Sequence, residues 1–177
     1  MRVLIWIVED TWEATVDEAV ELVPGDADVT LLHVAATEVE AVAGGSRRGL
    51  LGRRPPPTPH HAHADPLRAL SEEATQALLA EARGRLGRDA ALEARRGRIE
   101  REVVDAAADA DLLVLARDGD HSRLGPHSLG PAARFVVDHA PCRVLLVWPD
   151  EAPGVGTIPP PPARGAEPPP PPPPPPR

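Results

Sequence analysis

Two polar segments directly follow apolar runs of the sequence, and their residue types suit phosphate or nucleotide binding. Asp10 comes after the run Val3–Val8, and the longer segment Arg117–Leu129 comes after the run Leu112–Ala116. The longer segment contains glycines, carboxylates, arginines and histidines, and it ends at Gly130, where a helix is predicted to begin. Glycine lets a backbone approach a phosphate, and the N–H groups at a helix start bind anions. These two segments form our candidate binding site.

The remaining reactive side chains predict neither a metal site nor catalysis. His60–His63 lies in a proline-rich stretch, where neighbouring histidines give a metal no fixed geometry. Ser128 is not in a nucleophile elbow, because Pro126 occupies the position that needs glycine. Cys142 is the only cysteine, which excludes an internal disulfide. With no base–nucleophile pair at a workable spacing, we predict no catalytic residues and no enzyme.

The composition excludes several classes of protein. All 19 basic residues are arginine, so the chain has no Walker A lysine and no Schiff-base lysine. A net charge of -8 and 2% aromatic residues argue against nucleic-acid binding. The apolar run Val3–Val8 is too short for a signal peptide or a membrane span. We therefore expect a cytoplasmic protein with no nucleic-acid and no membrane partner.

The prolines divide the chain. Of 24 prolines, five lie between Pro55 and Pro66 and fifteen lie at Pro149 or beyond. We interpret residues 36–65 as a mobile insert rich in Pro, Arg and His within a domain of residues 1–148, and residues 149–177 as a disordered proline-rich tail. The tail is either a stiff appendage, which we favour, or a polyproline ligand for an unidentified protein partner.

Outside these stretches, the apolar pattern alternates between strand and helix. Predicted strands cover residues 3–8, 29–34, 91–95, 112–116 and 142–148, and predicted helices cover residues 12–23, 66–86, 99–110 and 131–139. The polar strand at 91–95 suits a sheet edge, whereas those at 3–8, 29–34 and 112–116 are apolar enough to be central. This order predicts a parallel sheet with helices on both faces, in which the loops after Val8 and Ala116 face each other.

The chain resembles the universal stress protein family over about residues 2–34 and 67–148. The resemblance rests on these segments: Val8-Glu9-Asp10, Leu31–Val34, Ala110–Leu115, Gly130 and His139–Val147. It implies an α/β, Rossmann-like fold of the adenine nucleotide alpha hydrolase type, with a five-stranded parallel sheet of order 3-2-1-4-5. It also implies a homodimer through the last strand, Cys142 to Trp148. Some members of the family bind ATP and others do not.

The resemblance also locates a candidate nucleotide pocket. Its residues are Asp10, Val34, Arg117, Gly119, Gly130 and Pro131. The family's ATP-binding pattern has three glycines followed by Ser or Thr, and only Gly130 matches it. Arg117 and Asp120 occupy the other glycine positions, Gly119 is one place off register, and Pro131 replaces the Ser or Thr.

These departures predict a pocket that is degraded for ATP. Asp118 and Asp120 would place negative charge beside a triphosphate, and Pro131 removes a hydroxyl and an N–H from the helix start. Against this, Arg117, His121 and Arg123 could supply positive charge. We expect no bound cofactor, with ATP possible but disfavoured.

Three single residues each allow a functional and a structural interpretation. Asp10 would either contact a nucleotide or cap the following helix, and Glu13 three residues later favours the cap. His33 is predicted to be a hydrogen-bonded core residue rather than a ligand. Trp148 and the apolar last strand favour self-association over an edge covered by the chain itself.

Three functions follow, in decreasing order of support. The first is a non-enzymatic, dimeric regulatory or interaction protein with an altered nucleotide pocket. The second is a nucleotide-dependent switch in which Arg117 and Arg123 replace the missing glycines. The third is an enzyme acting on a small phosphorylated or nucleotide substrate.

Overall fold

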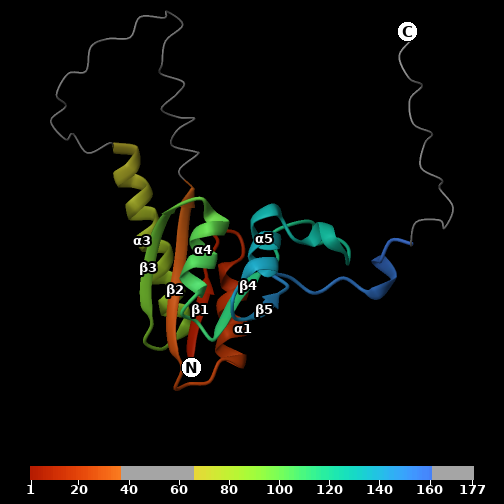
Figure 1. The fold of residues 1–177 in the computed structure, drawn as a ribbon, viewed down its shortest axis with the longest axis horizontal. Coiled ribbons are helices and arrows are strands. Elements are labelled where there is room, and N and C mark those ends of the chain that lie inside the picture. The colour runs from red at the N-terminus through yellow and green to blue at the C-terminus, as the bar shows by residue number, and fades with distance from the viewer. Residues whose placement is uncertain (37–65, 161–177) are drawn as a thin grey trace, which may run out of the picture.

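The alternating strands and helices form one parallel sheet in the computed structural model, which describes residues 1–36 and 66–160 (Figure 1). The strands are β1 (Arg2–Trp6), β2 (Asp28–Ala36), β3 (Ala91–Gly97), β4 (Leu112–Ala116) and β5 (Arg143–Val147). The helices are α1 (Trp12–Leu22), α3 (Pro66–Leu86), α4 (Ile99–Ala107) and α5 (Pro131–His139). Two short 3-10 turns follow β4 and β5, namely η1 (Pro126–Ser128) and η2 (Val155–Thr157).

The sheet has the predicted order, β3-β2-β1-β4-β5, and all four strand pairings are parallel. The polar strand β3 is an edge and the apolar strands β1, β2 and β4 are internal, as their composition predicts. The centre of the register is Ile5, which lies opposite Leu31 of β2 and Val114 of β4. The order reverses between β1 and β4, where parallel α/β sheets bind ligands.

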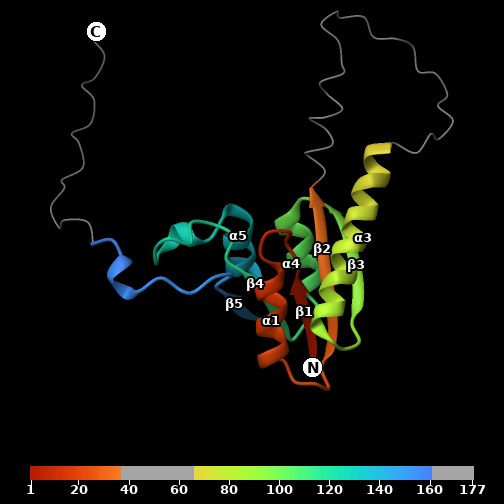
Figure 2. The same ribbon diagram turned by 180° about the vertical axis from the view of Figure 1, so that it is seen from behind.

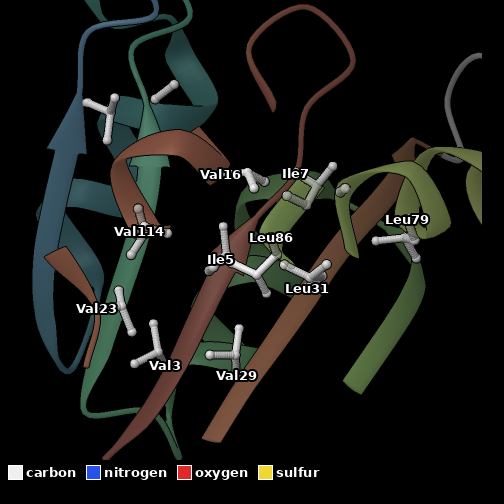
Figure 3. Packing of buried hydrophobic residues seen from close by; sticks show 14 residues of the cluster. Val3, Ile5, Ile7, Val16, Val23, Val29, Leu31, Leu79, Leu86 and Val114 are labelled. Atoms are coloured by element: carbon white, nitrogen blue, oxygen red, sulfur yellow. The ribbon is translucent and has the colours of Figure 1, made fainter. Parts of the chain in front are cut away.

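Alternation along β1 divides the core into two layers. Val3, Ile5 and Ile7 point toward α1 and α3, where they meet residues such as Val16 and Leu79 (Figure 3). Leu4 and Trp6 point to the other face and pack with α4 and α5. Figures 1 and 2, which are opposite views, show these two helix pairs on opposite faces of the sheet. Burial on both faces explains why β1 is a continuous apolar run.

The start of α1 differs from the prediction. β1 ends at Trp6, and Thr11 rather than Asp10 is the N-cap residue of α1, with no capping hydrogen bond from its side chain. Instead, the Thr11 carbonyl oxygen accepts hydrogen bonds from the Thr15 N–H at 3.2 Å and the Thr15 hydroxyl at 2.8 Å. The prediction that Asp10 caps the helix is therefore wrong, because one extra residue of turn moves the carboxylate beyond the helix start.

His33 behaves as predicted for a structural histidine. Its side chain is half-buried in β2, and its Nδ1 donates to the Ile7 carbonyl at 3.0 Å. This bond satisfies a backbone acceptor just past the end of β1, where the ladder to β2 has ended.

Parts of the insert and tail lie outside the described residues. The insert was expected over residues 36–65; Ala36 is the last residue of β2, and residues 37–65, with His60–His63, are outside the description. Residues 161–177 are outside it too. Residues 149–160 are described, and they run from β5 through η2. No helix within the two described ranges is long and apolar enough to cross a membrane.

Candidate functional site

A cleft of about 720 Å³ opens at the carboxyl end of the sheet. The loop after β1 and the start of α1 supply one wall, and the loop after β4 with the segment after β5 supplies the other. Its lining residues are Val8, Asp10, Thr11, Glu13, Ala14, Asp118, Gly119, His121, Pro149 and Asp150. The predicted meeting of the loops after Val8 and Ala116 is therefore confirmed.

The loop after β4 closes on itself. The Gly119 N–H donates to the Ser128 carbonyl at 3.1 Å, and the Asp120 N–H donates to the His127 carbonyl at 2.8 Å. The two sides of the loop lie so close that a Cβ at Gly119 would overlap the His127 carbonyl oxygen. Glycine at this position thus allows two backbone segments to approach closely. Two N–H groups of the loop are already engaged in hydrogen bonds within the loop.

A carboxylate from the same loop occupies the start of α5. The Gly130 N–H, at the N-cap of α5, donates to Asp118 Oδ1 at 2.6 Å. A Cβ at Gly130 would lie 2.9 Å from Asp118 Oδ2, so the carboxylate rests directly against this glycine. Pro131 is the first residue of the helix and has no N–H to offer. Negative charge at a helix start is favourable, and here the protein supplies that charge itself.

Arg117 is held away from the cleft by the side chains around it. Its guanidinium Cζ lies 4.4 Å from the ring centroid of Trp148, and its Nη1 donates to the Ser128 hydroxyl. The Ser128 hydroxyl in turn donates to the Gly125 carbonyl at 2.7 Å. Partial burial lowers the pKa of Arg117. Arg117 and Trp148 therefore fasten the loop after β4 to the end of β5.

His121 joins the same cluster. Its Nε2 donates to the Arg117 carbonyl at 3.0 Å, and its ring meets Trp148 edge-on with 6.2 Å between centroids. Its Nδ1 lies 3.7 Å from a carboxylate oxygen of Asp150. The histidine lines the cleft, but both its nitrogens face protein groups.

Asp120 and Arg123 satisfy each other. The Asp120 carboxylate accepts from the Ser122 hydroxyl at 2.5 Å, from the Ser122 N–H at 3.0 Å and from Arg123 Nε at 3.1 Å. The hydrogen bonds from Ser122, its hydroxyl first, are the main cause of a lowered pKa of Asp120. Neither residue is among those that line the cleft. The charges of Asp120 and Arg123 therefore act on each other, and neither side chain lies where it would repel or attract an anion in the cleft.

The cleft is acidic. Among the described residues that line it, four are carboxylates, on Asp10, Glu13, Asp118 and Asp150, and none is an arginine. Two like charges about 4 Å apart repel by about 1 kcal/mol in water and about 4 kcal/mol near a protein surface. A polyphosphate in this cleft would meet that repulsion with few donors to offset it.

The predicted site residues separate into four groups. Asp10 and Gly119 line the cleft, and Gly130 and Pro131 form the helix start behind Asp118. Arg117 stands beside the cleft under Trp148. Val34 lies in the core layer with Leu32 and Trp6, with only 5% of its surface exposed, and is not a lining residue.

The cleft also includes residues that the sequence analysis did not select, namely Thr11, Glu13, Pro149 and Asp150. Pro149 and Asp150 could have been predicted, because β5 is parallel to β4 and its end must lie at the same edge of the sheet. Asp118 was noted only for its charge; its bond to Gly130 spans twelve residues and has no local signature.

Neither metal binding nor nucleophilic attack is favoured by the geometry. Within residues 1–36 and 66–160, no three His, Cys, Asp or Glu side chains come together to hold a metal ion. Ser128 is fully buried, and its hydroxyl is engaged by Gly125 and Arg117.

The fold and the cleft define the class: a parallel α/β protein with a cleft at the switch point of its sheet. The model of the universal stress protein family matches residues 2–147. The chain therefore belongs to the universal stress protein family. A comparison with curated proteins found no significant match.

Solved structures agree on the fold. The chain is similar to a hypothetical protein whose biochemical function was assigned from its structure, with a TM-score of 0.58 and 19% identity over 83% of this chain and 94% of that one. It is similar to universal stress protein UspA from Lactobacillus plantarum, with a TM-score of 0.53 and 22% identity over 83% and 97% of the two chains. It is also similar to a universal stress protein in complex with cAMP, with a TM-score of 0.55 and 16% identity over 85% and 98%.

Proposed function

We propose that this protein is a non-enzymatic, dimeric regulatory or interaction protein of the cytoplasm, with a nucleotide cleft that is closed to ATP. The observation that carries the proposal is the Asp118 carboxylate, 2.6 Å from the Gly130 nitrogen at the start of α5. An anion bound at this helix start would have to displace a carboxylate that belongs to the protein.

Three further features support the closed cleft. The N–H groups of Gly119 and Asp120 donate to carbonyls within their own loop. The first residue of α5 is Pro131, which has no N–H. The nearby arginines do not compensate, because Arg117 stacks on Trp148 and Arg123 pairs with Asp120. These contacts hold the loop in place without a ligand.

A nucleotide-dependent switch is the second candidate, and one observation favours it. A universal stress protein of the same fold is described in complex with cAMP. A cyclic monophosphate carries less negative charge than a triphosphate, so the acidic cleft would repel it less. The volume of about 720 Å³ also lies within the range of small-molecule sites. An enzyme acting on a small phosphorylated substrate has the least support, since no nucleophile–base pair among the described residues faces the cleft.

Calorimetry of the full chain with Mg-ATP and with cAMP tests the proposal. We expect no heat of binding for ATP up to millimolar concentration, because the helix start is occupied. A low-micromolar dissociation constant for ATP would overturn the closed cleft. Binding of cAMP alone would favour the switch, and mass spectrometry of small molecules that co-purify with the protein gives an independent check. Turnover of any nucleotide, lost in Asp10→Ala, would support an enzyme.

The dimer is proposed from the difference between the two sheet edges. On β3, Arg95 pairs with Glu93 at 2.6 Å and with Glu102 at 3.7 Å, so this edge carries charges that resist further pairing. On β5, Val144, Leu145 and Leu146 are only half-buried, and the strand pairs with β4 alone in the described part of the chain. An apolar edge of this kind favours a second strand.

Light scattering after gel filtration tests the dimer. We expect the unmodified chain to run as a dimer and Leu145→Asp to run as a monomer. Leu92→Asp is the matched control, because Leu92 is a partly buried leucine of the same core layer on the opposite edge. It should lower stability without changing the assembly. A monomeric unmodified chain would remove the dimer from the proposal and leave the cleft argument unchanged.

A further inference from the structure

Two segments project together beyond the β5 edge of the sheet. One is the loop of residues 120–128, which contains η1, and the other is residues 149–158, which contain η2. Figures 1 and 2 both show them on the side away from α3 and β3, with the blue turn of η2 farther out than β5. The Leu124 N–H donates to the Thr157 hydroxyl at 3.0 Å and links the two segments. We call these residues the arm.

The arm carries apolar side chains into solvent. Val155 is 79% exposed and Ile158 is 56% exposed, although both are large aliphatic residues. The hydroxyl of Thr157 donates to the Gly154 carbonyl at 2.7 Å, which holds η2 in a turn. The turn is held by hydrogen bonds, and its apolar residues are exposed in the described structure. The arm therefore presents a small apolar surface of defined shape.

The charges around β5 suit a two-fold axis. Arg143 is exposed at the start of the strand, and Glu151 is exposed just beyond its end, after Asp150. In a symmetric dimer each surface meets its own copy, so opposite charges at the two ends of an edge strand come together when two copies pair antiparallel. β5 has this arrangement, since the acidic end of one strand would lie beside the basic start of the other.

We propose that the arm crosses to a second copy of this chain and grips it, with Val155 and Ile158 as its apolar contacts and Glu151 beside the second copy's Arg143. The inference rests on the proposed dimer through β5. In antiparallel pairing, the end of one β5 lies next to the start of the other, so an arm that leaves the end of β5 away from its own sheet must pass over the second copy. The root of the arm holds His121 and Asp150, so the same assembly would brace the wall of the cleft.

Charge reversal and mixing test the contact between copies. Arg143→Glu alone and Glu151→Arg alone should each raise the dissociation constant of the dimer by about three- to tenfold, because each creates two like-charged pairs. An equimolar mixture of the two variants should recover dimers, since both pairs in the heterodimer are then opposite in charge. Recovery in the double variant but not in the mixture would show that the pair forms within one chain and would overturn the proposal.

Arm variants test the apolar contact. Sedimentation of the full chain with Val155→Asp and Ile158→Asp should show a dimer at least about tenfold weaker than the unmodified chain. Leu22→Asp is the matched control, because Leu22 on α1 is also 56% exposed but lies off the arm. A dimer that is broken by Leu145→Asp but unaffected by the arm variants would overturn the arm and leave the proposed dimer standing. A monomeric unmodified chain would overturn both.

Discussion

The two loops that form the cleft differ in how far their polar groups are engaged by the protein itself. The loop after β1 is short, and it is closed by one backbone bond, from the Thr11 N–H to the Val8 carbonyl at 3.0 Å. Its carboxylate, Asp10, is exposed in the cleft. The loop after β4 is long, and many of its polar groups are engaged within the loop, such as the Gly119 and Asp120 N–H groups, or by Trp148 and Asp150.

This difference concerns the backbone N–H groups, which an anion site would need to have free. A phosphate site needs free N–H groups, and the donors that such a site would use belong to the loop after β4. There, Asp118 and the carbonyls of His127 and Ser128 accept those bonds. Under the proposed function, the cleft would keep its volume of about 720 Å³ but would bind anions weakly.

Gly119→Ala should give the largest effect on the long loop. The added Cβ would overlap the His127 carbonyl oxygen, so the backbone must shift. We expect the free energy of unfolding to fall by about 1–3 kcal/mol in urea denaturation. Gly25→Ala is the matched control, since nothing lies within 4 Å of a Cβ there, and it should be neutral or slightly stabilising. Equal effects at both glycines would contradict the tight closure of the loop.

Asp118→Ala should have the next largest effect. It removes the carboxylate that accepts the Gly130 N–H at the start of α5, and a hydrogen bond of this kind contributes about 0.5–1.5 kcal/mol of stability. Asp118→Asn keeps an acceptor oxygen and should cost less. Neither variant should bind Mg-ATP, because the Gly119 and Asp120 donors stay engaged. If calorimetry found ATP binding in Asp118→Ala, Asp118 alone would be closing the cleft.

A smaller effect is expected from the pH dependence of Asp120. The hydrogen bonds from the Ser122 hydroxyl and N–H lower the pKa of its carboxyl in the folded state. A lowered folded pKa contributes stability above the unfolded pKa, near 4, and this stability is lost as the pH falls through the folded pKa. In Ser122→Ala, an NMR titration should show the Asp120 pKa moving back up. An unchanged pKa would mean that the turn is not formed in solution.

The smallest effect is expected at Asp10 in the short loop. It neither caps α1 nor packs in the core, and surface changes of this kind stay within about 0.5 kcal/mol. Asp10→Ala should therefore leave urea unfolding nearly unchanged, in contrast to Asp118→Ala. A loss as large as that of Asp118→Ala would erase the contrast between the two loops.

Much of the fold was predictable because its signals are local. The apolar runs of β1, β2 and β4 predicted internal strands, and the charged pattern of β3 predicted an edge. α5 begins at Pro131 and ends at His139, as predicted. Errors occurred where one residue of turn decides the outcome, as at Asp10, where Thr11 takes the cap position.

The site was harder to predict, since its contacts join distant positions. The charges of Asp118, Asp120 and Arg123 were visible in the sequence, but not their directions. In the structure Asp118 accepts the N–H of Gly130 and lines the cleft, while Asp120 and Arg123 turn toward each other. Val34 was predicted to lie in the pocket from its position along the chain. The pleat of β2 instead directs its side chain into the core.

The sequence by itself determined the strands and helices, which strands are internal, the family resemblance and the departures from its glycine pattern, because periodicity, strand polarity and motif spacing are properties of the chain. Only the tertiary structure decided that a carboxylate of the chain itself lies at the start of α5. A carboxylate can reach the start of α5 only when a loop of twelve residues folds back, and the bonds that close this loop lie between residues that no local pattern pairs. The arm beyond β5 was decided in the same way, by a bond between Leu124 and Thr157 across the fold.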